Sequence, residues 1–222
     1  MRNLFILAIL VFSISSVQAQ KAPTYTTKSD AQSVNILKKV HQKYGAYSSM
    51  QMDIKLTVKS GKNSDIQTSK LSVKGDKFRM TSKAQDMASD GKILWNHQKA
   101  SKECYISNPE EEEMGMFGSP DKMLKMYEKD FISALIATVK ENGRTVYKIE
   151  FKPKSKNSDF TKVRLTVDKA TSRVNRIKMF DRSNTHYTIE MSNFKTNAAI
   201  NSSKFVINTK TLPKGTEVID MR

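Results

Sequence analysis

The sequence predicts a mainly β protein with a small helical part, built around one large curved antiparallel sheet. Apolar and polar residues alternate with a period of two in many segments, which is typical of strands with one buried face. Glycines fall between these segments, where turns often need a positive φ angle. Only two segments have the spacing and end signals of a helix. The sequence has no internal repeat and no linker rich in Pro, Gly or Ser, so we expect a single domain.

The first 19 residues have the pattern of a secretory signal peptide. Arg2 precedes an apolar run from Leu4 to Phe12, and the segment ends in Val17-Gln18-Ala19. The apolar run is shorter than the roughly 20 residues that a membrane-spanning helix needs. We expect cleavage after Ala19 and export of residues 20–222 as one domain. An uncleaved membrane anchor is the alternative.

Two helices are predicted. The first runs from about Ser29 to Tyr44 and ends at Gly45, and the second begins at Ser119-Pro120-Asp121, where a capping serine precedes proline at the first helical position. Apolar residues at helical spacing are Val34, Leu37, Val40 and Tyr44 in the first helix, and Met123, Leu124, Met126 and Tyr127 in the second.

Strands account for most of the remaining chain. The longest alternating run contains Met50, Met52, Ile54, Leu56 and Val58, and similar runs cover 147–151, 163–167 and 187–191. Shorter candidates lie around 66–73, 78–80, 93–95, 105, 174–179 and 205–207. The segment Phe131 to Val139 has a composition that also suits a helix. We predict a strand there because it leads into Asn142-Gly143, a strong hairpin signal.

The segment from Ser89 to Ser107 predicts a further hairpin. Asp90-Gly91 forms a turn before its first strand, and Asp90 is better explained by this turn than by acid catalysis. Ile93 and Trp95 would share one face of the strand. Because Leu94 is apolar as well, the sequence leaves open which face points inward.

A hydrophobic cavity is the main functional expectation. About ten or eleven strands with only two or three helices against them would enclose more apolar space than their own side chains fill. Methionine, which adapts to varied apolar partners, occurs 12 times, several times at inward positions. The cavity is predicted to be lined by Met50, Met52, Ile54, Leu56, Leu71, Phe78, Met80, Ile93, Trp95, Ile149, Phe151, Val163, Leu165, Ile177, Met179, Ile189 and Met191.

Charge and motifs exclude several other classes of function. The net charge is +16, but the lysines are scattered along the strands and the chain is predicted to be exported, so we expect no nucleic-acid partner. The basic residues suit a solvated outer surface or, alternatively, attraction to an anionic membrane. His41, His97 and His186 lie on different predicted elements, and Cys104 is the only cysteine. We therefore expect no metal, no cofactor and no enzymatic activity.

Several segments in order carry a family resemblance. They are KLSVKGDKFRM at 70–80, SDGKILW at 89–95, YKIEFKPK at 147–154, RLTVD at 164–168 and SKFVINTKTLPKGTEVID at 203–220. In this order and spacing the chain resembles LolA, the family of periplasmic carriers of outer-membrane lipoproteins. In better-known members an arginine-proline pair before the strand at 77–80 helps to hold the lid. This chain has Gly75-Asp76 near that place, and Arg79 is expected to point away from Phe78 and Met80.

The resemblance implies an unclosed barrel with helices as a lid over the cavity. It assigns Leu37, Val40, Met123 and Met126 to the lid. It also implies a periplasmic, monomeric carrier that takes acylated lipoproteins from an inner-membrane lipoprotein-releasing transporter and passes them to an outer-membrane acceptor. The alternative with the same fold is a periplasmic lipid-binding sensor or a carrier of other lipids.

Overall fold

The computed structural model describes residues 28–109 and 130–222. The predicted signal peptide and the second predicted helix, with Met123 and Met126, lie outside the described residues. The helical elements are the α-helix α1 Ala31–Gly45 and the 3-10 helices η1 Ser202–Phe205 and η2 Thr209–Thr211. The strands are β1 Met50–Ser60, β2 Asn63–Lys74, β3 Lys77–Ser82, β4 Gln85–Ser89, β5 Leu94–Gln98, β6 Glu103–Ser107, β7 Phe131–Glu141, β8 Arg144–Pro153, β9 Phe160–Asp168, β10 Val174–Asp181, β11 Thr185–Thr196 and β12 Glu217–Asp220.

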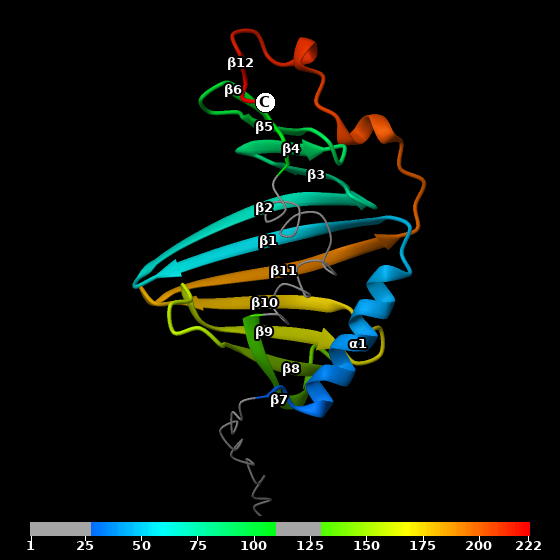
Figure 1. Cartoon of the computed structure of the whole chain (residues 1–222), viewed down its shortest axis with the longest axis vertical. Coiled ribbons are helices and arrows are strands. Elements are labelled where there is room, and N and C mark those ends of the chain that lie inside the picture. Colours follow the sequence, from blue (N-terminus) through cyan, green and yellow to red (C-terminus); the bar gives the residue numbers. More distant parts are fainter. Residues whose placement is uncertain (1–27, 110–129) are drawn as a thin grey trace, which may run out of the picture.

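All twelve described strands belong to one sheet, in the order β12-β6-β5-β4-β3-β2-β1-β11-β10-β9-β8-β7 (Figure 1). The end strands β12 and β7 do not pair with each other, so the sheet is not closed into a barrel. The predicted fold class is therefore confirmed. One detail differs, because β12 pairs with β6 in parallel and makes the sheet mixed.

The hairpin turns follow the local sequence signals. Between β7 and β8, Asn142 and Gly143 have φ angles of 49° and 75°, as a tight turn with two left-handed residues requires. Before β5, the Asp90 carboxylate accepts hydrogen bonds from the amides of Lys92 and Ile93, both at 2.9 Å. Asp90 is thus a turn residue, as predicted.

Helix α1 is fixed to the sheet at both of its ends. At its start, the Asp30 carboxylate accepts hydrogen bonds from the amide of Ser33 at 2.8 Å and from the amide of Leu135 in β7 at 2.6 Å. At its end, the Tyr44 hydroxyl accepts a hydrogen bond from the Val174 amide in β10 at 3.1 Å, and burial raises the Tyr44 pKa to about 12. The helix therefore crosses the sheet from β7 to β10 (Figure 1).

We call the face of the sheet that α1 covers the inner face. Strand register places the period-two apolar residues of neighbouring strands on this face. They form the main hydrophobic core together with Leu37, Val40 and Tyr44 of α1. This core extends along the inner face from Leu94 of β5 to Phe131 of β7, beyond the strands that the helix crosses.

The opposite, outer face is covered near β3 to β6 by residues 200–216, the C-terminal segment. Trp95 and Cys104 are buried there with Ile207, and Leu212 packs against the same cluster. Burial raises the pKa of the Cys104 thiol, and the charge of Asp86 adds to this. The strand predicted at 205–207 is wrong, because η1 ends at Phe205 and no strand of the described chain contains these residues.

Arg79 holds the C-terminal segment against the sheet. Its guanidinium forms an ion pair with Asp86 and donates hydrogen bonds to the carbonyls of Lys204 at 3.2 Å and Val206 at 3.3 Å. Register places Arg79 on the outer face, opposite Ser72 and Ala88 and away from Phe78 and Met80, as the alternation predicted. Its contacts are therefore with the C-terminal segment.

Candidate functional site

An apolar pocket of about 360 Å³ lies on the inner face beyond the region that α1 covers. It is built by β1, β2, β3, β10 and β11 together with the turn after β3 and the first residue of β4. The lining residues are Met52, Ile54, Leu56, Gln67, Ser69, Leu71, Met80, Ser82, Ala84, Gln85, Ile177, Met179, Tyr187, Ile189 and Met191. We call this site the apolar pocket. Its volume lies within the range of small-molecule sites, about 300–1,000 Å³.

Cross-strand pairing brings the apolar side chains of the pocket together. Ile54 pairs with Met191 and Leu56 with Ile189 between β1 and β11, and Ile189 also pairs with Ile177 of β10. Directly opposed residues on one sheet face have their Cβ atoms about 4.5–5.5 Å apart, so these side chains form a continuous apolar surface.

The pocket surface is partly open and adaptable. Met52, Leu71 and Ile177 are buried, whereas the other apolar lining residues on these strands are only half-buried. Four of the lining residues are methionines, whose unbranched thioether chains can follow ligands of different shapes. None of the lining residues carries a charge. The pocket can therefore hold an apolar chain without desolvating an ionised group.

Nine of the seventeen residues predicted to line a cavity lie in the apolar pocket. They are Met52, Ile54, Leu56, Leu71, Met80, Ile177, Met179, Ile189 and Met191. Six others, Met50, Phe78, Ile149, Phe151, Val163 and Leu165, are buried in the main core. Leu37 and Val40, predicted for the lid, are buried in the same core and do not line the pocket.

Ile93 and Trp95 are on the wrong side of the sheet for the predicted cavity. Trp95 pairs with Ala88 and Ile106. Trp95 and Ala88 belong to the cluster beneath the C-terminal segment, and Ile93 and Ile106 pack against it. Leu94 is the inward residue of this strand and joins the main core. Both faces of β5 are covered at its start, which explains why Leu94 and Trp95 are both apolar.

The prediction omitted the polar part of the pocket wall. Gln67 and Ser69 of β2 share the inner face with Leu71, and Ser82 pairs with Ser69. Alternation with Leu71 was the available signal, but polar residues are not expected to line an apolar site. Ala84, Gln85 and Tyr187 were also omitted, although Tyr187 belongs to a predicted alternating strand.

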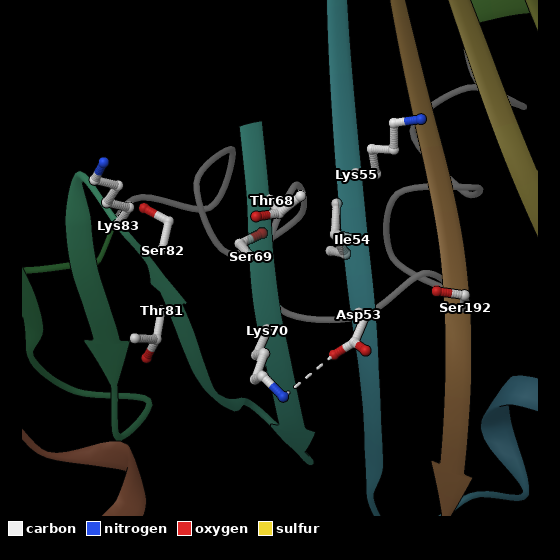
Figure 2. Close-up of a pocket in the computed structure, with 10 residues that line it drawn as sticks. All are labelled: Asp53, Ile54, Lys55, Thr68, Ser69, Lys70, Thr81, Ser82, Lys83 and Ser192. Carbon is white, nitrogen blue, oxygen red and sulfur yellow. Dashed lines mark ion pairs between the residues drawn. The ribbon is translucent and has the colours of Figure 1, made fainter. Parts of the chain in front are cut away.

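A second hollow, of about 490 Å³, lies on the outer face of β1, β2 and β3 (Figure 2). It is lined by Asp53, Ile54, Lys55, Thr68, Ser69, Lys70, Thr81, Ser82, Lys83 and Ser192. We call it the basic hollow, because three lysines and one aspartate give it two excess positive charges. Lys70 lies 3.8 Å from Asp53 and Lys55 lies 3.6 Å from Glu190.

Further along the outer face, a row of ion pairs crosses from β1 to β8. The guanidinium of Arg176 lies 3.2 Å from Glu141 and 3.3 Å from Glu190, and Lys148 lies 2.8 Å from Glu141. The hydrogen bond from Lys148, together with the nearby positive charges, holds the pKa of Glu141 below its usual value. This part of the outer face is charged and solvated, unlike the inner face.

No group of three or more His, Cys, Asp or Glu side chains in residues 28–109 and 130–222 could hold a metal ion. Within those same ranges, no helix has the length and apolar content needed to cross a membrane.

Comparison with known proteins adds a family to this geometry. The family model for outer membrane lipoprotein carrier protein LolA matches residues 46–208. No curated protein sequence matches the chain. Among solved structures, an uncharacterized conserved protein from Thermus thermophilus has a TM-score of 0.57 at 14% identity, covering 85% of this chain and 99% of its own. An outer membrane lipoprotein-sorting protein domain from Vibrio parahaemolyticus has a TM-score of 0.46 at 14% identity, with 82% and 99% covered.

Proposed function

The chain belongs to the LolA family of outer membrane lipoprotein carrier proteins, and from this premise we propose that it is a periplasmic chaperone for lipoproteins. It binds the acyl chains of its cargo in the apolar pocket and shuttles them from the inner to the outer membrane. The observation that carries this proposal is the pocket itself, an uncharged, methionine-rich cavity that the side chains of residues 28–109 and 130–222 leave unfilled.

The energetics of acyl chains explain why a carrier needs such a pocket. Each methylene exposed to water costs about 0.8 kcal/mol, so a chain of about a dozen methylenes costs about 10 kcal/mol to carry through water unprotected. A carrier must bury this surface and still release it at the acceptor. A half-buried wall of flexible side chains on an open sheet can bind a chain without enclosing it permanently.

Helix α1 serves in this proposal as a fixed wall beside the pocket. Its contacts to β7 through Asp30 and to β10 through Tyr44 hold both of its ends. The role of a movable lid falls to the second predicted helix, with Met123 and Met126. That assignment remains a prediction from the sequence.

The proposed cellular setting follows from the same function. The signal peptide is cleaved after Ala19, and residues 20–222 act as a monomer in the periplasm. The partners are acylated lipoproteins, an inner-membrane lipoprotein-releasing transporter that loads the carrier, and an outer-membrane acceptor. No nucleic acid, cofactor or catalytic step is part of this function.

Native mass spectrometry of the protein purified from its own periplasm tests the proposal. We expect a complex whose added mass is that of an acylated lipoprotein, and release of that mass by a detergent that competes for the apolar pocket. A complex that contains only free lipid would support the alternative, a sensor or carrier of other lipids. Protein that carries no acyl chain, even after incubation with an acylated lipoprotein, would contradict both.

A further inference from the structure

The apolar pocket and the basic hollow adjoin at a notch between β2 and β3. β3 pairs with β2 only as far as Ser82, which lies opposite Ser69. β2 continues from Ser69 back to Asn63, paired there with β1. Among the described strands, none pairs with the other edge of residues 63–68. The notch is the space between this edge and the turn at Lys83 and Ala84.

Lining residues of both sites meet at the notch. Ile54, Ser69 and Ser82 line the apolar pocket as well as the basic hollow. Gln67 and Ala84 line only the apolar pocket, whereas their neighbours Thr68 and Lys83 line only the basic hollow. The two walls of the notch therefore face the apolar pocket on one side of the sheet and the basic hollow on the other.

The polar lining residues of the apolar pocket also gather beside the notch. Gln67 and Ser69 lie on β2, Ser82 ends β3, and Gln85 begins β4. The far side of the pocket, on β10 and β11, is formed by Ile177, Met179, Tyr187, Ile189 and Met191. The pocket therefore has an apolar end and a polar end, and the polar end faces the notch.

Lys83 lies at the notch, and Lys70 lines the adjoining part of the basic hollow, opposite Thr81; both are available to a ligand. Lys70 is 83% exposed, and its partner Asp53 lies 3.8 Å away, a separation at which an exposed ion pair contributes little. No acidic side chain of residues 28–109 or 130–222 is within ion-pair distance of Lys83. Lys99 adds a third ammonium group at this place, 2.6 Å from the Ser82 carbonyl.

We propose that the apolar pocket takes amphiphiles whose polar end is anionic, with the acyl chain in the pocket and the anion at the notch beside Lys70 and Lys83. This inference rests on the proposed function and specifies its ligand. The shared chemistry is a carboxylate or phosphate within a few atoms of an acyl chain. Two sources supply it: the head of a free lipid, or acidic side chains next to the acylated residue of a lipoprotein.

Calorimetric titration with matched probes tests the inference. Hexadecanoate and hexadecanol share one chain length and differ in charge. A palmitoylated Gly-Glu-Glu amide and a palmitoylated Gly-Gln-Gln amide make the same comparison for an acylated peptide. The test variant is Lys70→Gln with Lys83→Gln. The control variant is Lys59→Gln with Lys178→Gln, which removes the same charge at exposed positions that line neither site.

We expect the wild type to bind each anionic probe about tenfold more tightly than its neutral partner, because ionised groups form stronger hydrogen bonds than neutral ones. The test variant should lose this preference and keep its affinity for hexadecanol within about twofold. The control variant should keep the preference, and added salt should weaken it in the wild type.

The outcomes separate the inference from the proposed function. Equal binding of anionic and neutral probes by the wild type, or equal effects of the two double variants, would overturn the inference alone. Failure of every acyl probe to bind would contradict the proposed function itself. A preference confined to the peptide pair identifies the acylated protein as the source of the anion, and one confined to hexadecanoate identifies a lipid head.

Discussion

Leu56→Glu is the sharpest test of the apolar pocket as an acyl-chain site. Leu56 is half-buried on the inner face of β1, opposite Ile189, and both residues line the pocket. In the empty protein the new carboxylate can remain hydrated at the pocket surface, so we expect the fold to tolerate it. An acyl chain that fills the pocket would remove this hydration.

The expected loss of affinity follows from the cost of neutralising that carboxylate. With an unperturbed pKa of about 4.3, protonating the glutamate at pH 7 costs about 1.36 × 2.7, or about 3.7 kcal/mol. This corresponds to about 500-fold weaker binding and is an upper limit, because the side chain can turn toward water. At pH 5.5 the cost falls to about 1.6 kcal/mol, or about 15-fold. Binding should therefore recover as the pH falls.

The assay is calorimetric titration of hexadecanol, a neutral probe, at pH 5.5 and pH 7. Leu56→Gln is the neutral control for polarity. Val58→Glu is the control for position, because Val58 lies on the same face of the same strand, two residues further along, and does not line the pocket. Loss of binding that is equal at both pH values, or equal in Leu56→Glu and Val58→Glu, would refute the pocket as the binding site.

Three further predictions concern the parts of the fold around the pocket. Arg79→Ala should lower the free energy of unfolding in urea by about 2–3 kcal/mol, because it removes the charged partner of Asp86 and the donor to two carbonyls of the C-terminal segment. Arg222→Ala, at an exposed ion pair, should have a much smaller effect. Equal effects of the two substitutions would contradict a holding role for Arg79. Cys104 should resist maleimide at pH 8 in the native protein and react in denaturant, since its side chain is fully buried; rapid native labelling would contradict the cover by the C-terminal segment. Burial alone would raise the pKa of Asp168, but hydrogen bonds from the residues around it hold this pKa below its usual value. Asp168→Asn should therefore lower the free energy of unfolding by about 1–3 kcal/mol at pH 7, and the difference from the wild type should shrink below about pH 3.9, where the wild type loses this stabilisation. A difference that stays constant down to pH 2 would refute this prediction.

The inward residues of the long strands could be predicted from sequence because only one face of each strand is buried by the protein. Met52, Ile54 and Leu56 alternate with polar or charged residues, so their common face was unambiguous. Strand β5 offered no such contrast. Leu94 meets the main core while Trp95 meets the C-terminal segment, so consecutive residues of this strand are apolar and the alternation is lost.

The division between core and pocket was not predictable from local pattern. Ile149 and Ile189 look alike in sequence, each at an inward position of an alternating strand. Ile149 is fully buried in the main core, whereas Ile189 packs against the edge of that core and lines the pocket. The spacing of Leu37 and Val40 shows that the helix has a buried face. It cannot show which part of the sheet that face meets, since the contact is between distant segments.

The C-terminal segment was the least predictable part of the fold. Phe205 and Ile207 were taken for a strand, but 3-10 turns lack both the period of a strand and that of an α-helix. Its buried residues are fixed instead by the guanidinium of Arg79 and by the outer face of β5. Neither partner lies near it in the sequence.

The pairing of β1 with β11 has a consequence for how the protein folds. Strands β1 to β6 and β7 to β11 each follow one another as neighbours, and among the described strands β1 with β11 is the one pairing that joins the two runs. Leu56 and Ile189 are partners in this pairing although 133 residues separate them in the chain. Closing a loop of that length costs about 4 kcal/mol of entropy before any contact forms. Each half of the sheet can form quickly through pairing of neighbouring strands, whereas association of the two halves should be the slow step of folding. Because the pocket is lined from both β1 and β11, the protein should acquire its binding site only in that last, slow step.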